Sequence, residues 1–231
     1  MKKHDIVYVL KNDVEPYELT YSLRSLKNFP HSRVIFFGGQ PSYIEPDIMV
    51  SVKQKGLTKW DKVSFTLKAI CQSGFVSDDF WLFNDDFFVL KKQTDFKNAY
   101  NGDLLSRVRE VEARYGNRQS AYSKQLRSLM RLLKENGMTT LNYAVHMPML
   151  INKEKALEVL EKYPTCPMFR SLYGNYHQIG GENRKDVKIL GMDRVPSEDA
   201  EFVSTSDESF INGEVGRFIR ERFTERSEFE V

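Results

Sequence analysis

The sequence has few cysteines and no long apolar run. Cys71 and Cys166 are its two cysteines in 231 residues, too few for a four-cysteine zinc site or for the disulfide framework of a small secreted domain, so we expect a reducing compartment. No apolar run approaches the roughly 20 residues that span a bilayer. The five apolar residues from Ile6 to Leu10 are also too few for a signal peptide. We therefore expect a cytoplasmic protein with no stable membrane insertion.

An excess of charge of one sign is lacking as well. The 34 Lys and Arg residues against 32 Asp and Glu residues give a formal net charge of +2, which argues against a nucleic-acid coat or a polybasic membrane anchor. Glycine and proline are scarce and 41% of the residues are hydrophobic, so the chain can bury a core. The sequence has no P-loop, no dinucleotide-binding glycine fingerprint and no serine elbow, which disfavours kinases, dehydrogenases and hydrolases.

Short apolar runs alternate with helical patterns in the first half of the chain. The runs predict strands, and the recurring leucines predict helices, at 5–10, 18–27, 33–37, 48–52, 61–72 and 80–83. This order predicts an α/β fold with a mainly parallel sheet covered by helices. The sequence has no repeat and no linker long enough to separate two domains, so we expect one domain over residues 1–231. Ligands of such sheets bind beyond the carboxyl ends of the strands, here residues 11–13, 38–40 and 84–86.

Residues 101–140 are predicted to form a helical, basic insertion in that domain. On a helix, Leu126, Leu129, Met130 and Leu133 share one face, and basic residues occupy the other. Two interpretations stay open: a solvated outer face, or a lobe that receives a phosphorylated or otherwise anionic partner. The stretch from Arg107 to Lys134 has two acidic residues and eight basic ones, namely Arg107, Arg109, Arg114, Arg118, Lys124, Arg127, Arg131 and Lys134.

An acidic pair follows the aromatic strand at 80–83. Asp85 and Asp86, next to Asn84, would repel each other at the end of a buried strand unless a cation offset their charge. Mg²⁺ and Mn²⁺ prefer oxygen ligands and commonly bridge carboxylates to substrate phosphates. We therefore predict a divalent cation here that holds a nucleotide diphosphate. The alternative is an Asx turn in which one aspartate caps the following segment.

Other candidates are single polar residues in unrelated surroundings. His146 lies in an apolar stretch, where an imidazole serves as a general base, binds phosphate, or is a satisfied core histidine. Asp207 is the other candidate base for an acceptor hydroxyl. Arg170 and His177 are expected in polar loops. Arg170 either binds phosphate through its planar guanidinium or pairs with a surface acid. Spacing along the chain does not decide among these roles.

Several blocks of the sequence resemble the Stealth family, in the same order along the chain. That family includes bacterial capsular polysaccharide phosphotransferases and the catalytic subunit of the lysosomal-enzyme N-acetylglucosamine phosphotransferase. The segment from 204 to 230 is also similar to the tail of bacterial and phage proteins described as glycosyltransferases. The Stealth-like blocks lie at 5–8, 18–26, 84–88, 146–149 and 170–171.

The resemblance implies a GT-A-like (Rossmann-like) nucleotide-sugar fold with Mn²⁺ or Mg²⁺ at Asp85 and Asp86. It also implies a catalytic His146, a supporting Arg24 and a phosphate-holding Arg170. The family's usual Trp-Val-Asp-Gly continuation of the first block is replaced here by residues 10–13. Altogether we assign catalysis and donor binding to two sets of residues: His146, Asp207 and Asp86 for catalysis, and Arg24, Asn84, Arg170 and His177 for the donor.

Three functions follow as hypotheses. The first is a metal-dependent glycosyltransferase that moves a sugar from a nucleotide-sugar donor to a hydroxyl of an acceptor glycan, a lipid-linked sugar or a modified DNA base. The second is a Stealth-type sugar-phosphate transferase, which would release a nucleoside monophosphate. The third is a non-catalytic module that binds an anionic polymer through the basic insertion.

Overall fold

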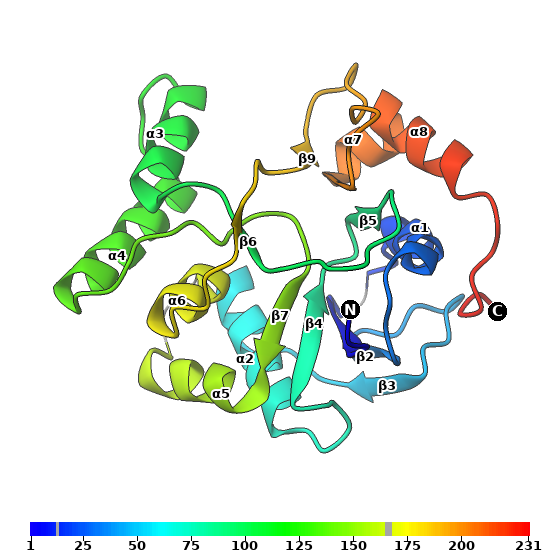
Figure 1. The fold of residues 1–231 in the computed structure, drawn as a ribbon, viewed down its shortest axis with the longest axis horizontal. Coiled ribbons are helices and arrows are strands. Elements are labelled where there is room, and N and C mark those ends of the chain that lie inside the picture. The colour runs from blue at the N-terminus through cyan, green and yellow to red at the C-terminus, as the bar shows by residue number, and fades with distance from the viewer. Residues whose placement is uncertain (13, 165–167) are drawn as a thin grey trace.

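The structure is a computed structural model that describes residues 1–12, 14–164 and 168–231. Asp13, one of the residues expected after the first strand, and Cys166 lie outside the described residues. The described chain is a mixed α/β structure with a mostly parallel central sheet flanked by helices (Figure 1). The predicted fold class is therefore confirmed.

The central sheet has the strand order β3-β2-β1-β4-β7. All neighbouring pairs are parallel except β4 and β7, which are antiparallel. The two central strands, β1 and β4, end at the same edge, and β4 leads directly into the acidic pair. The strands are β1 (Asp5–Leu10), β2 (Val34–Gly38), β3 (Ile48–Ser51), β4 (Asp79–Phe83) and β7 (Met149–Asn152).

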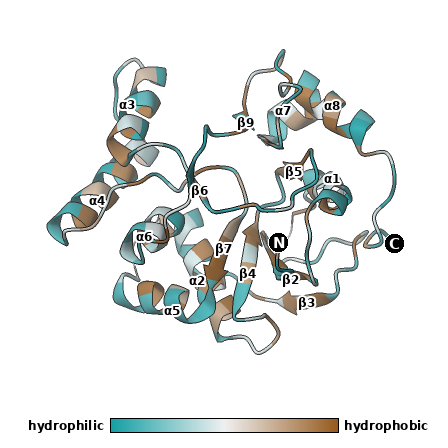
Figure 2. Cartoon of the chain, viewed as in Figure 1, coloured by the Kyte–Doolittle hydropathy of each residue, from teal (hydrophilic) through white to brown (hydrophobic). Residues whose placement is uncertain are grey.

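Strand β1 shows how the sheet separates two hydrophobic clusters. Ile6 and Tyr8 pack with α1 (Tyr17–Ser25) on one face, whereas Val7 packs with α2 (Lys59–Gln72) on the other. Alternate residues of a strand point to opposite faces, so a continuous apolar run suits a strand that is covered on both sides. Figure 2 shows that hydrophobic residues dominate the central strands. Helices α5 (Lys153–Lys162) and α6 (Phe169–Tyr176) lie on the α2 side.

Two smaller sheets bring the last third of the chain to the end of β4. Strand β10 (Phe202–Thr205) lies between β5 (Phe87–Val89), to which it is antiparallel, and β9 (Lys188–Ile189), to which it is parallel. Helices α7 (Asp207–Asn212) and α8 (Glu214–Arg222) follow β10. Strands β6 (Ala99–Tyr100) and β8 (Glu182–Asn183) form the other pair. Because β5 begins right after the acidic pair, β10 and β9 lie beside that pair.

The basic insertion contains a helical hairpin of α3 (Leu104–Arg114) and α4 (Ala121–Glu135), at the left of Figure 1. Each helix starts at a side-chain cap, at Asp103 and Ser120 respectively. The predicted apolar face of α4 is confirmed, because Leu126, Leu129 and Leu133 are buried. Its basic face is mostly solvated, although Arg127 pairs with Glu112 at 2.6 Å. The domain boundaries themselves stay a prediction.

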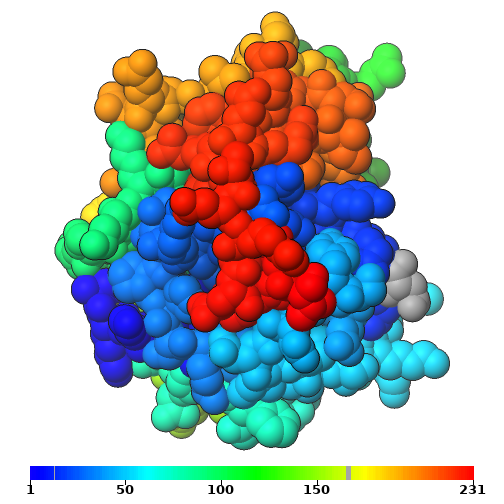
Figure 3. Space-filling view, turned by 90° about the vertical axis from the view of Figure 1, so that its right-hand side faces the viewer, coloured from blue at the N-terminus to red at the C-terminus, as the bar shows by residue number. Residues whose placement is uncertain are grey.

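Some boundaries differ from those expected. The predicted helix at 18–27 begins at Tyr17 and is α-helical to Ser25, after which a 3₁₀ turn, η1 (Leu26–Asn28), continues it. After α8 the chain crosses the surface as a tail, residues 224–231, shown in red in Figure 3. In the part of the chain that is described, no helix combines the length and apolar character needed to cross a bilayer.

Candidate active site

Four carboxylates from three separate parts of the chain gather at the carboxyl edge of the central sheet. Asp85 and Asp86 follow β4, Glu18 lies in the first turn of α1, and Asp207 lies in the first turn of α7. Glu18, Asp85 and Asp207 line one cavity of about 250 Å³, together with Lys11. The structure therefore brings the predicted metal residues together with Asp207. It adds Glu18, which the pattern of the sequence did not single out.

Burial and mutual repulsion raise the pKa of two of these carboxylates, Glu18 and Asp85. Burial raises the pKa of Glu18 to about 7, opposed by a hydrogen bond of 2.5 Å that the Thr205 hydroxyl donates to it. Burial, with the charge of Asp86, raises the pKa of Asp85 to about 6. Each negative charge disfavours the ionisation of its neighbours. A bound cation would relieve this repulsion.

Asp86 has one engaged oxygen and one free oxygen. Its Oδ2 accepts hydrogen bonds of 2.9 Å from Lys188 Nζ and from Ser204 Oγ. Its Oδ1 is buried and has no hydrogen-bond partner among the described residues. A buried oxygen with unused lone pairs suits a cation ligand.

The donor set at Asp85 and Asp86 fits Mg²⁺ or Mn²⁺ of the kind that completes its coordination with substrate phosphates. Within residues 1–12, 14–164 and 168–231, no group of three or more His, Cys, Asp or Glu side chains has a metal-binding arrangement. Phosphate and water oxygens would complete the coordination of a cation held by Asp85 and Asp86.

His146 belongs to a second cluster next to the first. Its Nδ1 lies 2.8 Å from Asp186 Oδ1 and 3.1 Å from Oδ2, and its backbone N–H also donates to Asp186. The bond to His146 holds the pKa of Asp186 at about 2 despite burial, so Asp186 is a carboxylate at neutral pH. A carboxylate at Nδ1 favours the tautomer with a proton there and a lone pair on Nε2. His146 is therefore a half-buried imidazole whose orientation is fixed by Asp186.

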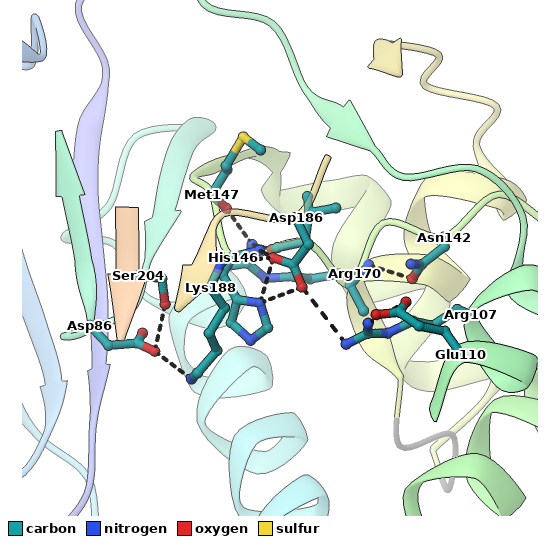
Figure 4. A network of polar contacts seen from close by, with 12 residues as sticks. Asp86, Arg107, Glu110, Asn142, His146, Met147, Arg170, Asp186, Lys188 and Ser204 are labelled. Atoms are coloured by element: carbon teal, nitrogen blue, oxygen red, sulfur yellow. Dashed lines mark hydrogen bonds and ion pairs between the residues drawn. The ribbon is translucent and has the colours of Figure 1, made fainter. Parts of the chain in front are cut away.

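Lys188 connects the two clusters. Figure 4 shows its side chain extending from beside His146 to Asp86. Residues from β9 and the segment before it thus bring Asp186 to the imidazole and Lys188 to the acidic pair. Neither residue stands in a periodic or motif-like pattern, and the fold alone reveals their position.

Arg170 forms hydrogen bonds with the end of β4 and with the segment before β7. It donates to the Met147 carbonyl at 2.6 Å, to the Leu82 carbonyl at 3.3 Å and to Asn84 Oδ1 at 3.4 Å. Its guanidinium lies over the Phe87 ring. Burial lowers the pKa of Arg170 to about 10, opposed by the charge of Asp86. Arg170 and Asn84 are thus both at the site, where Arg170 holds backbone carbonyls and Asn84 accepts a hydrogen bond from it.

Two predicted donor residues have partners elsewhere. Arg24 forms two hydrogen bonds with Glu230, of 2.8 and 2.6 Å, and so binds the tail. His177 ends α6, and its Nε2 lies 2.8 Å from the Lys155 carbonyl oxygen of α5. The structure therefore does not bring these two residues into the cluster around Asp85 and Asp86, because their side chains join other elements.

Two further cavities flank the acidic cluster. One of about 450 Å³ lies at the ends of β1, β2 and β3 and is lined by Asn12, Gly39 and Ser51. A Cβ on Gly39 would lie 2.1 Å from the Lys11 carbonyl oxygen, so only glycine permits this close approach of the two strand ends. The other cavity, of about 800 Å³, contains His146 and Lys188.

No protein-family profile and no curated protein matches the chain. Among solved structures, the galactosyltransferase LgtC, in complex with donor and acceptor sugar analogues, is similar over 95% of this chain and 94% of its own, with 12% identity and a TM-score of 0.48. The apo form of the glycosyltransferase GlyE from Streptococcus pneumoniae TIGR4 matches over 97% of this chain, with 11% identity and a TM-score of 0.47; the chain spans 61% of GlyE. Likenesses this weak carry no argument about activity, and none confirms the Stealth-type resemblance.

Proposed function

We propose that the protein is a metal-dependent glycosyltransferase that moves a sugar from a nucleotide-sugar donor to an acceptor hydroxyl. The observation that carries this proposal is the arrangement of two clusters side by side. A carboxylate pair with a free buried oxygen lies at the end of β4, and Lys188 links it to an imidazole that Asp186 orients. The first suits a donor diphosphate, and the second suits an acceptor hydroxyl.

The cavities provide places for the parts of the donor. The nucleoside would occupy the cavity at the ends of β1 to β3, and the diphosphate would lie at Asp85 and Asp86. Val14 and Glu15 line both this cavity and the one that contains Asp85, so the two are adjacent. Lys11 and Lys188 flank the acidic pair, and their ammonium groups would bind phosphate oxygens.

Mg²⁺ or Mn²⁺ bound to Asp85 and Asp86 would supply charge neutralisation of the leaving diphosphate. His146 Nε2 would accept the proton of the acceptor hydroxyl, while Asp186 stabilises the resulting imidazolium. The acceptor oxygen forms the new bond to the anomeric carbon. The bond from that carbon to the phosphate oxygen breaks, and the nucleoside diphosphate leaves with the electron pair.

The first experiment is a screen of nucleotide sugars with Mn²⁺ or Mg²⁺, with the nucleotide product identified by mass. We expect a nucleoside diphosphate that appears only with metal. A nucleoside monophosphate would instead indicate the sugar-phosphate transferase. Absence of turnover and of donor binding across the screen would contradict both enzymatic functions.

Asparagine substitutions test the cation site directly. The double variant Asp85→Asn, Asp86→Asn should lower metal-dependent binding of the donor nucleotide by at least about 100-fold, because two charged ligands are lost. Isothermal titration with and without Mn²⁺ measures this effect. The matched control is Asp78→Asn, an exposed aspartate at the opposite end of β4. Unchanged binding in the double variant would refute the cation assignment.

A further inference from the structure

The cavity of about 800 Å³ that contains His146 shares Lys188 with the donor site proposed above and extends away from the acidic pair to α3. It lies between α3 and the segment from 185 to 194. Three acidic residues line it, Glu110, Asp186 and Asp193. Five basic residues line it as well, from both of its walls: Arg107, Arg114, Lys185, Lys188 and Arg194.

Most of the acidic charge in this cavity is already neutralised. Glu110 pairs with two arginines, Arg107 and Arg114. Asp186 is bound to His146 and lies 3.7 Å from Arg107. By contrast, Lys185 and Arg194 have neither an ion pair nor a side-chain hydrogen bond among the described residues. These two cations are therefore available to a ligand.

Arg107 is a buried residue in the α3 wall of this cavity. Its side chain is only 9% exposed, and its Nε has no hydrogen-bond partner in the described chain. Figure 4 shows Arg107 and His146 directed at the same carboxylate, Asp186. A group held on the basic wall would therefore lie beside the oriented imidazole.

The outer face of α4 is a separate surface. Lys124, Arg131 and Lys134 are exposed there and do not line the cavity. The basic residues that face the cavity come from α3 and from the 185–194 segment. Leu190, which is 54% exposed, adds an apolar contact at the cavity wall. Sugar rings present both C–H faces and polar groups, so this mixture suits a charged sugar.

We propose that this cavity is the acceptor site and that it takes a sugar carrying an anionic group, a carboxylate or a phosphate. Lys185 and Arg194 hold the anion by charge-assisted hydrogen bonds, and this places a hydroxyl of the same sugar at His146 Nε2. The acceptor role rests on the proposed glycosyl transfer, whereas the affinity for anionic sugars does not.

Binding without donor or metal tests the site by itself. The probes are two matched pairs, 4-nitrophenyl β-D-glucuronide with 4-nitrophenyl β-D-glucoside, and glucose 6-phosphate with glucose. Ligand-observed NMR titration should show that at least one charged probe binds about tenfold or more tightly than its neutral partner. The affinity should fall as the salt concentration rises. Which pair shows the preference distinguishes a carboxylate from a phosphate.

Charge-reversal variants test whether the charged probe binds at Lys185 and Arg194. Lys185→Glu with Arg194→Glu should abolish the preference for the charged probe, and both residues are exposed, so folding is not at risk. The control, Lys124→Glu with Lys134→Glu, makes the same charge change on the outer face of α4 and should keep the preference. Equal binding of charged and neutral probes, no binding of either charged probe, or equal loss in both variants would overturn the proposal.

An assay of donor turnover distinguishes failure of the proposed glycosyl transfer from failure of the proposed anionic-sugar site. Metal-dependent hydrolysis of the donor by the unaltered protein, measured without acceptor, reports on glycosyl transfer chemistry alone. Turnover without a preference for charged probes would overturn the anionic site and leave the transferase. A preference for charged probes without turnover or binding of any donor would overturn the transferase and leave an anionic-sugar site.

Discussion

Glu18 is buried beside three other acidic groups, and its ionisation therefore opposes folding. Burial raises its pKa to about 7, and Asp86, Asp85 and Asp207 add to this effect. In the unfolded chain the same carboxyl ionises near its ordinary value of 4.5. A carboxyl whose pKa is raised by folding stabilises the protein below the unfolded pKa, and this contribution is lost as the pH rises through the folded pKa.

We expect Glu18→Gln to remove this pH dependence. Without divalent cations, the free energy of unfolding of the unaltered protein should fall between about pH 4.5 and pH 7. The variant should be more stable by about 2 kcal/mol at pH 8 and nearly equal at pH 4. Urea unfolding across this range measures the difference. Glu154→Gln, an exposed glutamate in the first turn of α5, is the control, and parallel pH curves for Glu18→Gln and unaltered protein would contradict the prediction.

Single substitutions also test the pair formed by His146 and Asp186. Asp186→Asn leaves a neutral group at Nδ1 and loses both the tautomer preference and the charge that stabilises an imidazolium. We expect kcat to fall about 100-fold or more with donor KM little changed, because general-base catalysis contributes about that much. Steady-state kinetics with the identified donor measure this. His146→Ala should lower kcat by a similar factor, and a change in donor KM alone would argue against a base.

Helix α6 packs closely against the segment before β7 because of one glycine. A Cβ on Gly174 would lie 2.5 Å from ring atoms of Tyr143, whose ring is buried and whose hydroxyl donates to the Gly180 carbonyl. This contact fixes the chain that leads to His146. An element that approaches so closely tolerates no extra methyl group without displacement.

Gly174→Ala should therefore destabilise the protein by about 1–3 kcal/mol, even though alanine is the better helix former. Chemical unfolding measures the change. Gly74→Ala is the matched control, because a Cβ there meets no atom within 4 Å, and its stability should change by less than about 0.5 kcal/mol. Equal stability of the two variants would show that α6 can move away from Tyr143.

At the scale of the whole molecule, an ion pair binds the C-terminal tail, residues 224–231, to α1. Arg24 and Glu230 form a bidentate pair with side chains only 14% and 7% exposed. Ser227 donates two further hydrogen bonds to Glu230. Figure 3 shows the tail lying across the surface beside the N-terminal part of the chain. This pair joins residues at nearly opposite ends of the sequence.

Glu230→Ala should cost about 2–4 kcal/mol, because it leaves the Arg24 guanidinium partly buried without its carboxylate. The control is Glu225→Ala, whose pair with Lys27 is exposed by 80% and 52%, and whose loss should cost less than about 1 kcal/mol. Thermal unfolding gives the two values. Limited proteolysis of the tail should also accelerate in Glu230→Ala alone, and equal effects of the two substitutions would refute a structural clamp.

The sequence by itself determined the features that depend on neighbouring residues. Strands β1 to β4 follow from apolar runs, the apolar face of α4 follows from leucine spacing, and the acidic pair follows from its place after an aromatic strand. These patterns are local, since strand and helix periodicities act over a few residues. The β5-β10-β9 sheet lacked such a signal because its strands contain only two to four residues.

Only the tertiary structure decided which distant side chains meet. His146 meets Asp186 across 40 positions, Glu18 meets Thr205 across 187, and Arg24 meets Glu230 across 206. The segment around each of these side chains does not indicate which distant residue it contacts. Their partners depend on how the strands are ordered and where the last third of the chain returns. Burial then raises the pKa values of Glu18 and Asp85, and the bond to His146 lowers that of Asp186; no local pattern contains these effects.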